Sequence, residues 1–193
     1  MNNKLNTKDL ITTGIFTTIY IVIFFTCGML GYIPILLVLL PLICPIVTGI
    51  PFMLFLTKVK KFGMVTIMGL IIGLVMFLTG HTFVPVITGL IFGLAADLIF
   101  KAGNYQSFRN SVIGYGVFSL FILGAMVPMW VMRDSYFVHM SSSMGTEYVN
   151  TVMALTPEWM FFVLIIIAFV AGIIGAFLGK SVLEKHFKRA GIA

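Results

Sequence analysis

Charged side chains are scarce in this chain. Of its 193 residues only 9% are charged, while 60% are hydrophobic, and the mean hydropathy is +1.14. A soluble domain usually carries charge on about a quarter of its residues. Twelve Lys and Arg with six Asp and Glu cannot cover the surface of a soluble domain of this length. The composition therefore excludes a soluble globular protein and predicts a chain whose main solvent is lipid.

Motifs for catalysis, metal binding and nucleotide binding are also missing. The sequence has no HExxH motif and no pair of carboxylates inside an apolar segment. Cys27 and Cys44 lack CxxC spacing and a paired histidine, so we interpret them as small buried apolar residues. The stretch 179–181 ends like a phosphate-binding loop, but Ile174 stands where that motif requires glycine. We therefore expect no enzyme activity, no metal, no cofactor and no ATP use by this chain alone.

Long apolar segments are what the sequence does have. About 20 mainly apolar residues are needed to cross the hydrocarbon core of a membrane. The segments predict an all-α, polytopic membrane protein, a bundle of six transmembrane helices that forms one transmembrane domain over residues 1–193. The second segment contains Pro41, Pro45 and Pro51, which predict a bent or broken helix. The expected spans are 10–30, 35–57, 62–78, 83–100, 111–132 and 159–178.

The basic residues predict how the bundle is oriented. With six spans, eleven of the twelve Lys and Arg fall on one side and only Arg133 falls on the other. Lys and Arg concentrate in the cytoplasmic connections of membrane proteins. We therefore expect cytoplasmic N- and C-termini in a cell (plasma) membrane. The same clustering between apolar runs argues against nucleic acid as a partner.

The segments also contain small residues and one buried acid. Asp97 precedes Lys101 by four residues, the spacing of a helical ion pair, and we favour this structural role over proton coupling, the other role of intramembrane acids. Glycines four residues apart predict close helix packing inside the bundle, with a partner-docking face as the alternative. These glycines are Gly69 with Gly73, Gly89 with Gly93, and Gly175 with Gly179.

The outer connections combine aromatic rings with a few hydrogen-bonding groups, which suits a small polar heterocycle. Tyr and Trp also anchor helices at the membrane interface, so Trp130 and Trp159 keep both interpretations. The connection 133–157 is longer than most and contains Gly145, so we predict an outer lid loop, with a freely solvated loop as the alternative. The candidate substrate-binding residues are Thr79, His81, Trp130, Tyr136, Tyr148, Asn150, Glu158 and Trp159.

Several stretches resemble one family in the same order along the chain. They are DLITTGIFTTIY from Asp9, GMLGYIP from Gly28, TGHTF from Thr79, GLAADLI from Gly93, GAFLGK from Gly175 and EKHFKRAG from Glu184. With six predicted spans, cytoplasmic ends and no nucleotide motif, the chain resembles the substrate-binding S components of energy-coupling-factor transporters. More specifically, it is similar to the Trep_Strep group of integral membrane proteins.

The resemblance implies a transport mechanism. Such a subunit captures a vitamin or a vitamin precursor outside the cell and docks on a transmembrane scaffold subunit that carries two ABC-type ATPases. It then topples in the membrane and exposes its site to the cytoplasm. Family members dock through two alanines four residues apart in the first span, where this chain has Gly14 and Thr18. The resemblance implies hydroxymethylpyrimidine or a pyridoxine-like heterocycle as the substrate.

Two other functions are compatible with the sequence. A self-sufficient, proton-coupled secondary transporter of a small polar solute would use Asp97 as its coupling group. An intramembrane hydrolase would use His81 and Glu158, although these two residues have no motif spacing.

Overall fold

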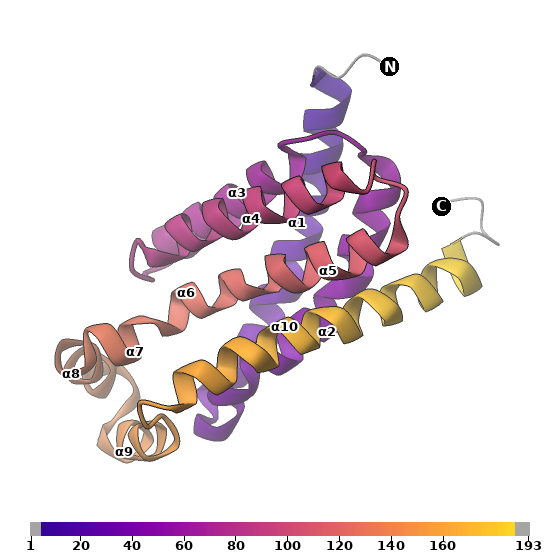
Figure 1. Ribbon diagram of the computed structural model, residues 1–193. Helices are drawn as coiled ribbons and strands as arrows, with labels where there is room; N and C mark the ends of the chain where they lie inside the picture. The colour runs from indigo at the N-terminus through magenta and orange to yellow at the C-terminus, as the bar shows by residue number, and fades with distance from the viewer. Residues whose placement is uncertain (1–4, 188–193) are drawn as a thin grey trace.

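The computed structural model describes residues 5–187, and no strand occurs among them. This confirms the predicted all-α class (Figure 1). The helical elements follow each other along the chain as α1 (Thr7–Gly28), η1 (Met29–Tyr32), α2 (Pro34–Lys58), α3 (Met64–Leu78), α4 (Val84–Ala102), α5 (Phe108–Ser119), η2 (Leu120–Ile122), α6 (Leu123–Met126), α7 (Pro128–Val131), α8 (Arg133–Met144), α9 (Thr146–Leu155), α10 (Met160–Val182) and η3 (Leu183–Phe187).

Each of the six predicted apolar segments is helical, but they differ in length. α3 has 15 residues and is therefore roughly 22 Å long, shorter than the hydrocarbon core of about 30 Å. The fifth segment is built from α5, η2, α6 and α7 in succession. Within the described residues, five stretches are long and apolar enough to cross a membrane, namely Thr7–Tyr32, Pro34–Lys58, Val84–Ala102, Phe108–Met126 and Met160–Lys185.

α2 continues without a break through its three prolines. This excludes a broken helix, and a bend at the prolines stays a prediction. The Thr48 hydroxyl donates to the Cys44 carbonyl oxygen at 2.7 Å. The Tyr115 hydroxyl, which comes from α5, donates to the Pro45 carbonyl oxygen at 2.7 Å. These two bonds place side-chain donors beside Pro45, and the second one ties α2 to α5.

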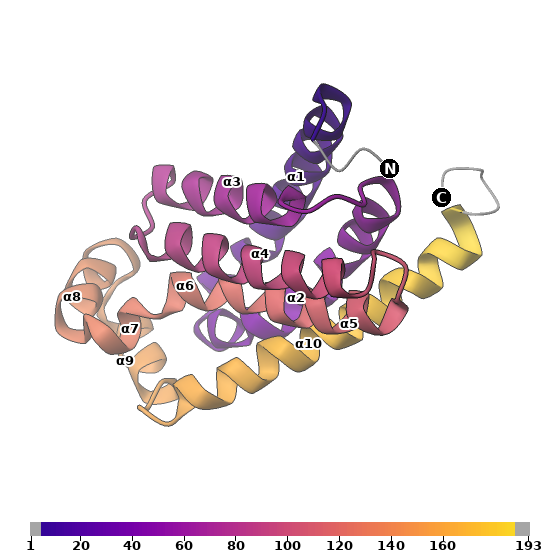
Figure 2. The same ribbon diagram turned by 45° about the horizontal axis from the view of Figure 1, so that its top comes forward.

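The connection 133–157, predicted to be a loop, forms the helices α8 and α9. They meet at Gly145, whose φ of +86° is a conformation that glycine adopts readily. Arg133 fixes this pair, since its guanidinium donates to the Met129, Thr156 and Met153 carbonyl oxygens at 3.3, 2.9 and 3.3 Å. Figure 2 shows α8 and α9 together at one end of the molecule, opposite the C-terminal end of α10.

Two helix pairs are joined through glycines, as the sequence predicted. α3 lies along α4, and α2 packs along α10 (Figures 1 and 2). A Cβ atom at Gly73 would lie only 2.5 Å from the Pro85 carbonyl oxygen in α4. A Cβ atom at Gly179 would lie 2.6 Å from the Gly49 carbonyl oxygen in α2. The prediction of internal packing is confirmed at these positions, because only glycine lets the backbones come this close.

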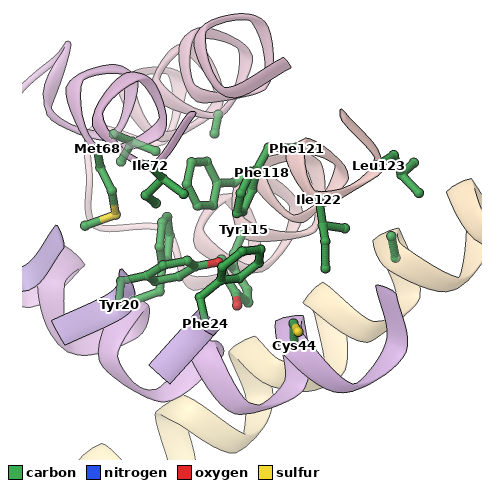
Figure 3. Packing of buried hydrophobic residues seen from close by; sticks show 14 of the residues in the cluster. Tyr20, Phe24, Cys44, Met68, Ile72, Tyr115, Phe118, Phe121, Ile122 and Leu123 are labelled. Carbon is green, nitrogen blue, oxygen red and sulfur yellow. The ribbon is translucent and has the colours of Figure 1, made fainter. Parts of the chain in front are cut away.

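An aromatic core joins α1, α2 and α5 in the middle of the molecule (Figure 3). The Phe52 ring centroid lies 4.5 Å from that of Tyr115 and 4.9 Å from that of Phe118. The Thr48 hydroxyl lies 3.1 Å from the Tyr20 hydroxyl and 3.0 Å from the Tyr115 hydroxyl. Thr48 therefore links the two buried tyrosine hydroxyls by hydrogen bonds, and Phe24 and Cys44 of this region also border the cavity.

Candidate ligand cavity

A cavity of about 390 Å³ lies at the end of the bundle that α8 and α9 close. Sites for small molecules usually fall between about 300 and 1,000 Å³. The C-terminal end of α1, η1, the first half of α2, the α3–α4 turn, α6 and the two helices α8 and α9 all contribute to its wall. Sulfur and aromatic groups dominate that wall, which contains Met29, Met76, Met126, Met129, Met140 and Met144 together with Phe24, Phe25, Tyr32, Tyr136 and Tyr148.

Few polar groups reach the cavity, and none of its described lining residues is Asp, Glu, Lys or Arg. Burial raises the pKa of Tyr136 to about 12, and burial also raises the pKa of Tyr148. Both phenols are therefore neutral at physiological pH. The Tyr148 hydroxyl donates to the Gly31 carbonyl oxygen and so ties α9 to η1. Such a wall can hold an uncharged ring, whereas a buried anion would find no counter-charge.

His81 is placed in the wall by the tight turn that ends α3. Gly80 has a φ of +99°, and the backbone N–H of His81 donates back to the Met76 carbonyl oxygen at 3.1 Å. The Nδ1 atom of the His81 ring lies 3.2 Å from the same oxygen. Thr79, two residues earlier, donates its hydroxyl to the Val75 and Met76 carbonyl oxygens. Thr79 thus caps α3, and only His81 of this pair lines the cavity.

Three of the eight residues predicted to bind substrate line this cavity, namely His81, Tyr136 and Tyr148. The other five lie outside its lining. Trp130 is half-buried, and its Nε1–H donates to the Pro157 carbonyl oxygen at 3.1 Å while its ring lies 5.3 Å from that of Phe161. Trp130 therefore holds the start of α10 against α7. The remaining residues are exposed or serve a helix end, namely Thr79, Asn150, Glu158 and Trp159.

The methionines of the cavity wall and Cys44 were not predicted as residues of the ligand site. Six of the chain's 13 methionines line the cavity, although their sequence positions show no common spacing. Thioether side chains are flexible and polarizable and make favourable contacts with aromatic rings. The high methionine content was the one signal that could have pointed to them. Cys44 is 1% exposed and borders the cavity, which agrees with its interpretation as a small buried residue.

Asp97 has a different partner from the one predicted. Its carboxylate, 0% exposed, accepts from the Thr66 backbone N–H at 2.7 Å and from the Thr66 hydroxyl at 2.6 Å. It therefore caps the N-terminus of α3 from α4, where a negative charge is favoured by the helix dipole. The predicted pair with Lys101 is wrong, since the Lys101 ammonium lies 5.2 Å from the Phe62 ring centroid instead.

The two residues proposed for docking lie on an open surface of α1. Nothing lies within 4 Å of a Cβ atom built on Gly14, and Thr18 is exposed, with its hydroxyl donating to the Gly14 carbonyl oxygen at 2.9 Å. Exposed isoleucines flank them, including Ile15 and Ile19 at 55% and 42% exposure. A neighbouring face of α1, with Thr13 and Thr17, is buried.

Comparison with known proteins gives one family. Comparisons with curated proteins and with solved structures gave no significant match. The family described as "hypothetical bacterial integral membrane protein (Trep_Strep)" matches residues 7–189, nearly the whole chain. The match agrees with the apolar helices of the structure, which make this a multi-pass membrane protein. The chain belongs to the Trep_Strep family of bacterial integral membrane proteins.

Proposed function

We propose that this protein is the substrate-capture subunit of an ATP-driven importer of the energy-coupling-factor type. Its substrate is a neutral heteroaromatic vitamin or precursor, with hydroxymethylpyrimidine and pyridoxine-like compounds as the first candidates. The observation that carries the proposal is the cavity of about 390 Å³, with its methionine and aromatic wall and no charged group in its described lining. Aromatic contacts supply the burial, and the few polar groups fix the orientation of the ring.

The distribution of charge supports an outward-facing cavity. The basic connections follow the C-terminal ends of α2, α4 and α10, for example at Lys58, Lys101 and Lys180. α8 and α9 lie at the opposite end (Figure 1). If the basic end is cytoplasmic, the cavity opens to the outside. In this topology α3 also counts as a span, which brings the number of spans to six. It is paired along its length with α4, and both termini are cytoplasmic.

The open face of α1 supports docking to a transmembrane scaffold subunit. Gly14 and Thr18 allow another helix to approach α1 closely, because neither carries a bulky side chain. The exposed isoleucines beside them add apolar area. We propose that ATP hydrolysis takes place on two partner ATPases, and that this chain is not itself an enzyme.

Binding to the isolated subunit tests the proposal. The purified chain in detergent is titrated with hydroxymethylpyrimidine and with pyridoxine in a calorimeter. We expect saturable binding of one of them, and we expect Met126→Lys, which puts an ammonium into the apolar wall, to abolish it. The matched control is Phe162→Lys, at an exposed position of α10. Absence of binding to any neutral heterocycle of this kind would contradict the proposal.

The hydrogen bonds of Asp97 bear on the alternative of a proton-coupled carrier. A coupling group must gain and lose a proton during transport, whereas the Asp97 carboxylate is occupied by the N-terminus of α3. Proteoliposomes that contain only this chain test the alternative directly. Accumulation of substrate under a pH gradient, without partner ATPases, would favour the carrier over the capture subunit.

The hydrolase alternative receives no support from the geometry. His81 lines the cavity, but Glu158 does not. Glu158 is exposed and lies two residues before the start of α10. The two side chains therefore share no described site in which one could act as a base for the other.

A further inference from the structure

We propose that the cavity recognises hydrogen-bond donors on its ligand, and that the Nε2 atom of His81 is the acceptor that selects a ring amino group. The inference rests on the proposed function and specifies the chemistry of its substrate. It implies a neutral, flat ring with N–H or O–H groups at its edge, and it excludes rings that carry only acceptors or methyl groups.

The tautomer of His81 follows from its hydrogen bond to the Met76 carbonyl oxygen. The Nδ1 atom lies 3.2 Å from the Met76 carbonyl oxygen, which can only accept. In a neutral imidazole one nitrogen donates and the other accepts. Nδ1 therefore carries the hydrogen, and Nε2 is left as an acceptor. The backbone N–H of His81 donates to the same oxygen at 3.1 Å. This bond fixes the backbone of the turn that carries the ring.

The hydroxyl groups of Tyr148 and Tyr136 also line the cavity. Tyr148 has one hydroxyl hydrogen, and it is donated to the Gly31 carbonyl oxygen. Toward a ligand the Tyr148 oxygen can therefore only accept. Tyr136 has no fixed hydrogen-bond partner among the described residues and can either donate or accept. Two of these three polar side chains thus present acceptors, and a ligand that offers donors satisfies them.

A ligand that lacks the amino group is expected to bind with lower affinity. A methyl group has nearly the size of an amino group but cannot donate, so it would leave the Nε2 atom of His81 without a partner. A site built to hydrogen-bond a substrate group discriminates strongly against the analogue that lacks it. For one neutral hydrogen bond at the half-open edge of a cavity we expect roughly a tenfold difference in Kd.

The experiment uses two ligands that differ in one group. Hydroxymethylpyrimidine carries a ring amino group, and the comparison ligand carries a methyl group in its place. Kd is measured for both by calorimetry with the full-length wild-type chain, with His81→Phe and with His81→Gln. Phe keeps a flat ring but has no acceptor, whereas the Gln side chain keeps an acceptor oxygen. Equal thermal unfolding midpoints for the three proteins show that each one is folded.

We expect the wild type to prefer the amino ligand roughly tenfold, His81→Phe to lose the preference, and His81→Gln to restore part of it. An equal Kd for both ligands in the wild type would overturn the inference while the proposed function stands. A preference that survives in His81→Phe would also overturn it. If the wild type binds neither ligand, the proposed substrate class fails and the inference fails with it.

Discussion

The glycine-joined helix pairs and the cavity end are built on opposite packing principles. Along α3–α4 and α2–α10, the backbones approach each other closely at glycines. At the cavity, the wall consists of long methionine and aromatic side chains around a space of about 390 Å³. The first arrangement has one geometry, because backbone contact leaves no room to adjust. The second can change shape, since thioether chains adopt many rotamers at low cost.

The difference separates the frame of the molecule from its ligand site. In lipid there is no hydrophobic effect to press helices together, so close backbone packing stabilises the frame. The site can then be deformable without loss of the fold. The following predictions test this separation, in order of decreasing effect on the stability of the isolated chain.

The largest loss is expected from Gly73→Leu. A Cβ atom at this position already lies 2.5 Å from the Pro85 carbonyl oxygen, and the rest of the leucine side chain must push α3 away from α4. We expect a loss of roughly 3 kcal/mol or more, seen as a lower unfolding midpoint in detergent and a lower yield of folded protein. Gly14→Leu is the matched control, because its Cβ has open space. Equal midpoints for the two variants would break the comparison at its base.

A smaller loss is expected from Asp97→Ala, which removes the cap of α3 from α4. The Thr66 N–H and hydroxyl would lose their acceptor inside the bundle, which costs about 2 kcal/mol. Asp97→Asn keeps one acceptor oxygen and is expected to lose less. Unfolding midpoints in detergent measure both. A transport defect in Asp97→Asn with unchanged stability would point instead to proton coupling.

Trp130→Phe tests whether this residue belongs to the frame or to the site. The change removes the hydrogen bond to the Pro157 carbonyl oxygen but keeps a ring beside Phe161. We expect a loss of about 1 kcal/mol in stability and little change in ligand affinity. Tyr136→Phe, inside the cavity, is the comparison variant and is expected to show the reverse pattern. A large loss of affinity in Trp130→Phe would assign Trp130 to the ligand site.

The smallest effect on stability is expected from Gly14→Leu and Thr18→Leu on the open face of α1. Both side chains point into free space in the isolated chain, so we expect changes within about 0.5 kcal/mol. Ligand binding by the isolated subunit should also be normal. Uptake by cells that contain the partner subunits should be blocked, because a scaffold helix could no longer come close. Normal uptake in both variants would place the docking face elsewhere.

Much of the frame could be predicted from the sequence, since it depends on local properties. A run of about 20 apolar residues forms a helix in lipid wherever it occurs, because its backbone groups have no other partners. Gly69 and Gly89 signal close packing by their lack of a side chain, and the structure places them in contact. Whether α2 would break at its prolines was not predictable, because the groups that satisfy a helix backbone around proline can come from neighbouring helices.

The candidate site was predicted only in part. His81, Tyr136 and Tyr148 were found because polar and aromatic residues in outer connections are conspicuous. Trp130 was conspicuous for the same reason, yet it faces Pro157 and Phe161. The cavity methionines looked like any apolar residue of a span. Nothing in the sequence around 133–157 showed that it folds into two helices held by Arg133.

The sequence by itself determined that this chain is a helical membrane protein, because hydropathy acts on each segment separately. Only the tertiary structure decided which side chains share the cavity and which partners Asp97 and Trp130 have. These contacts join residues from different helices, and the angle and rotation of each helix are set by its neighbours rather than by its own sequence.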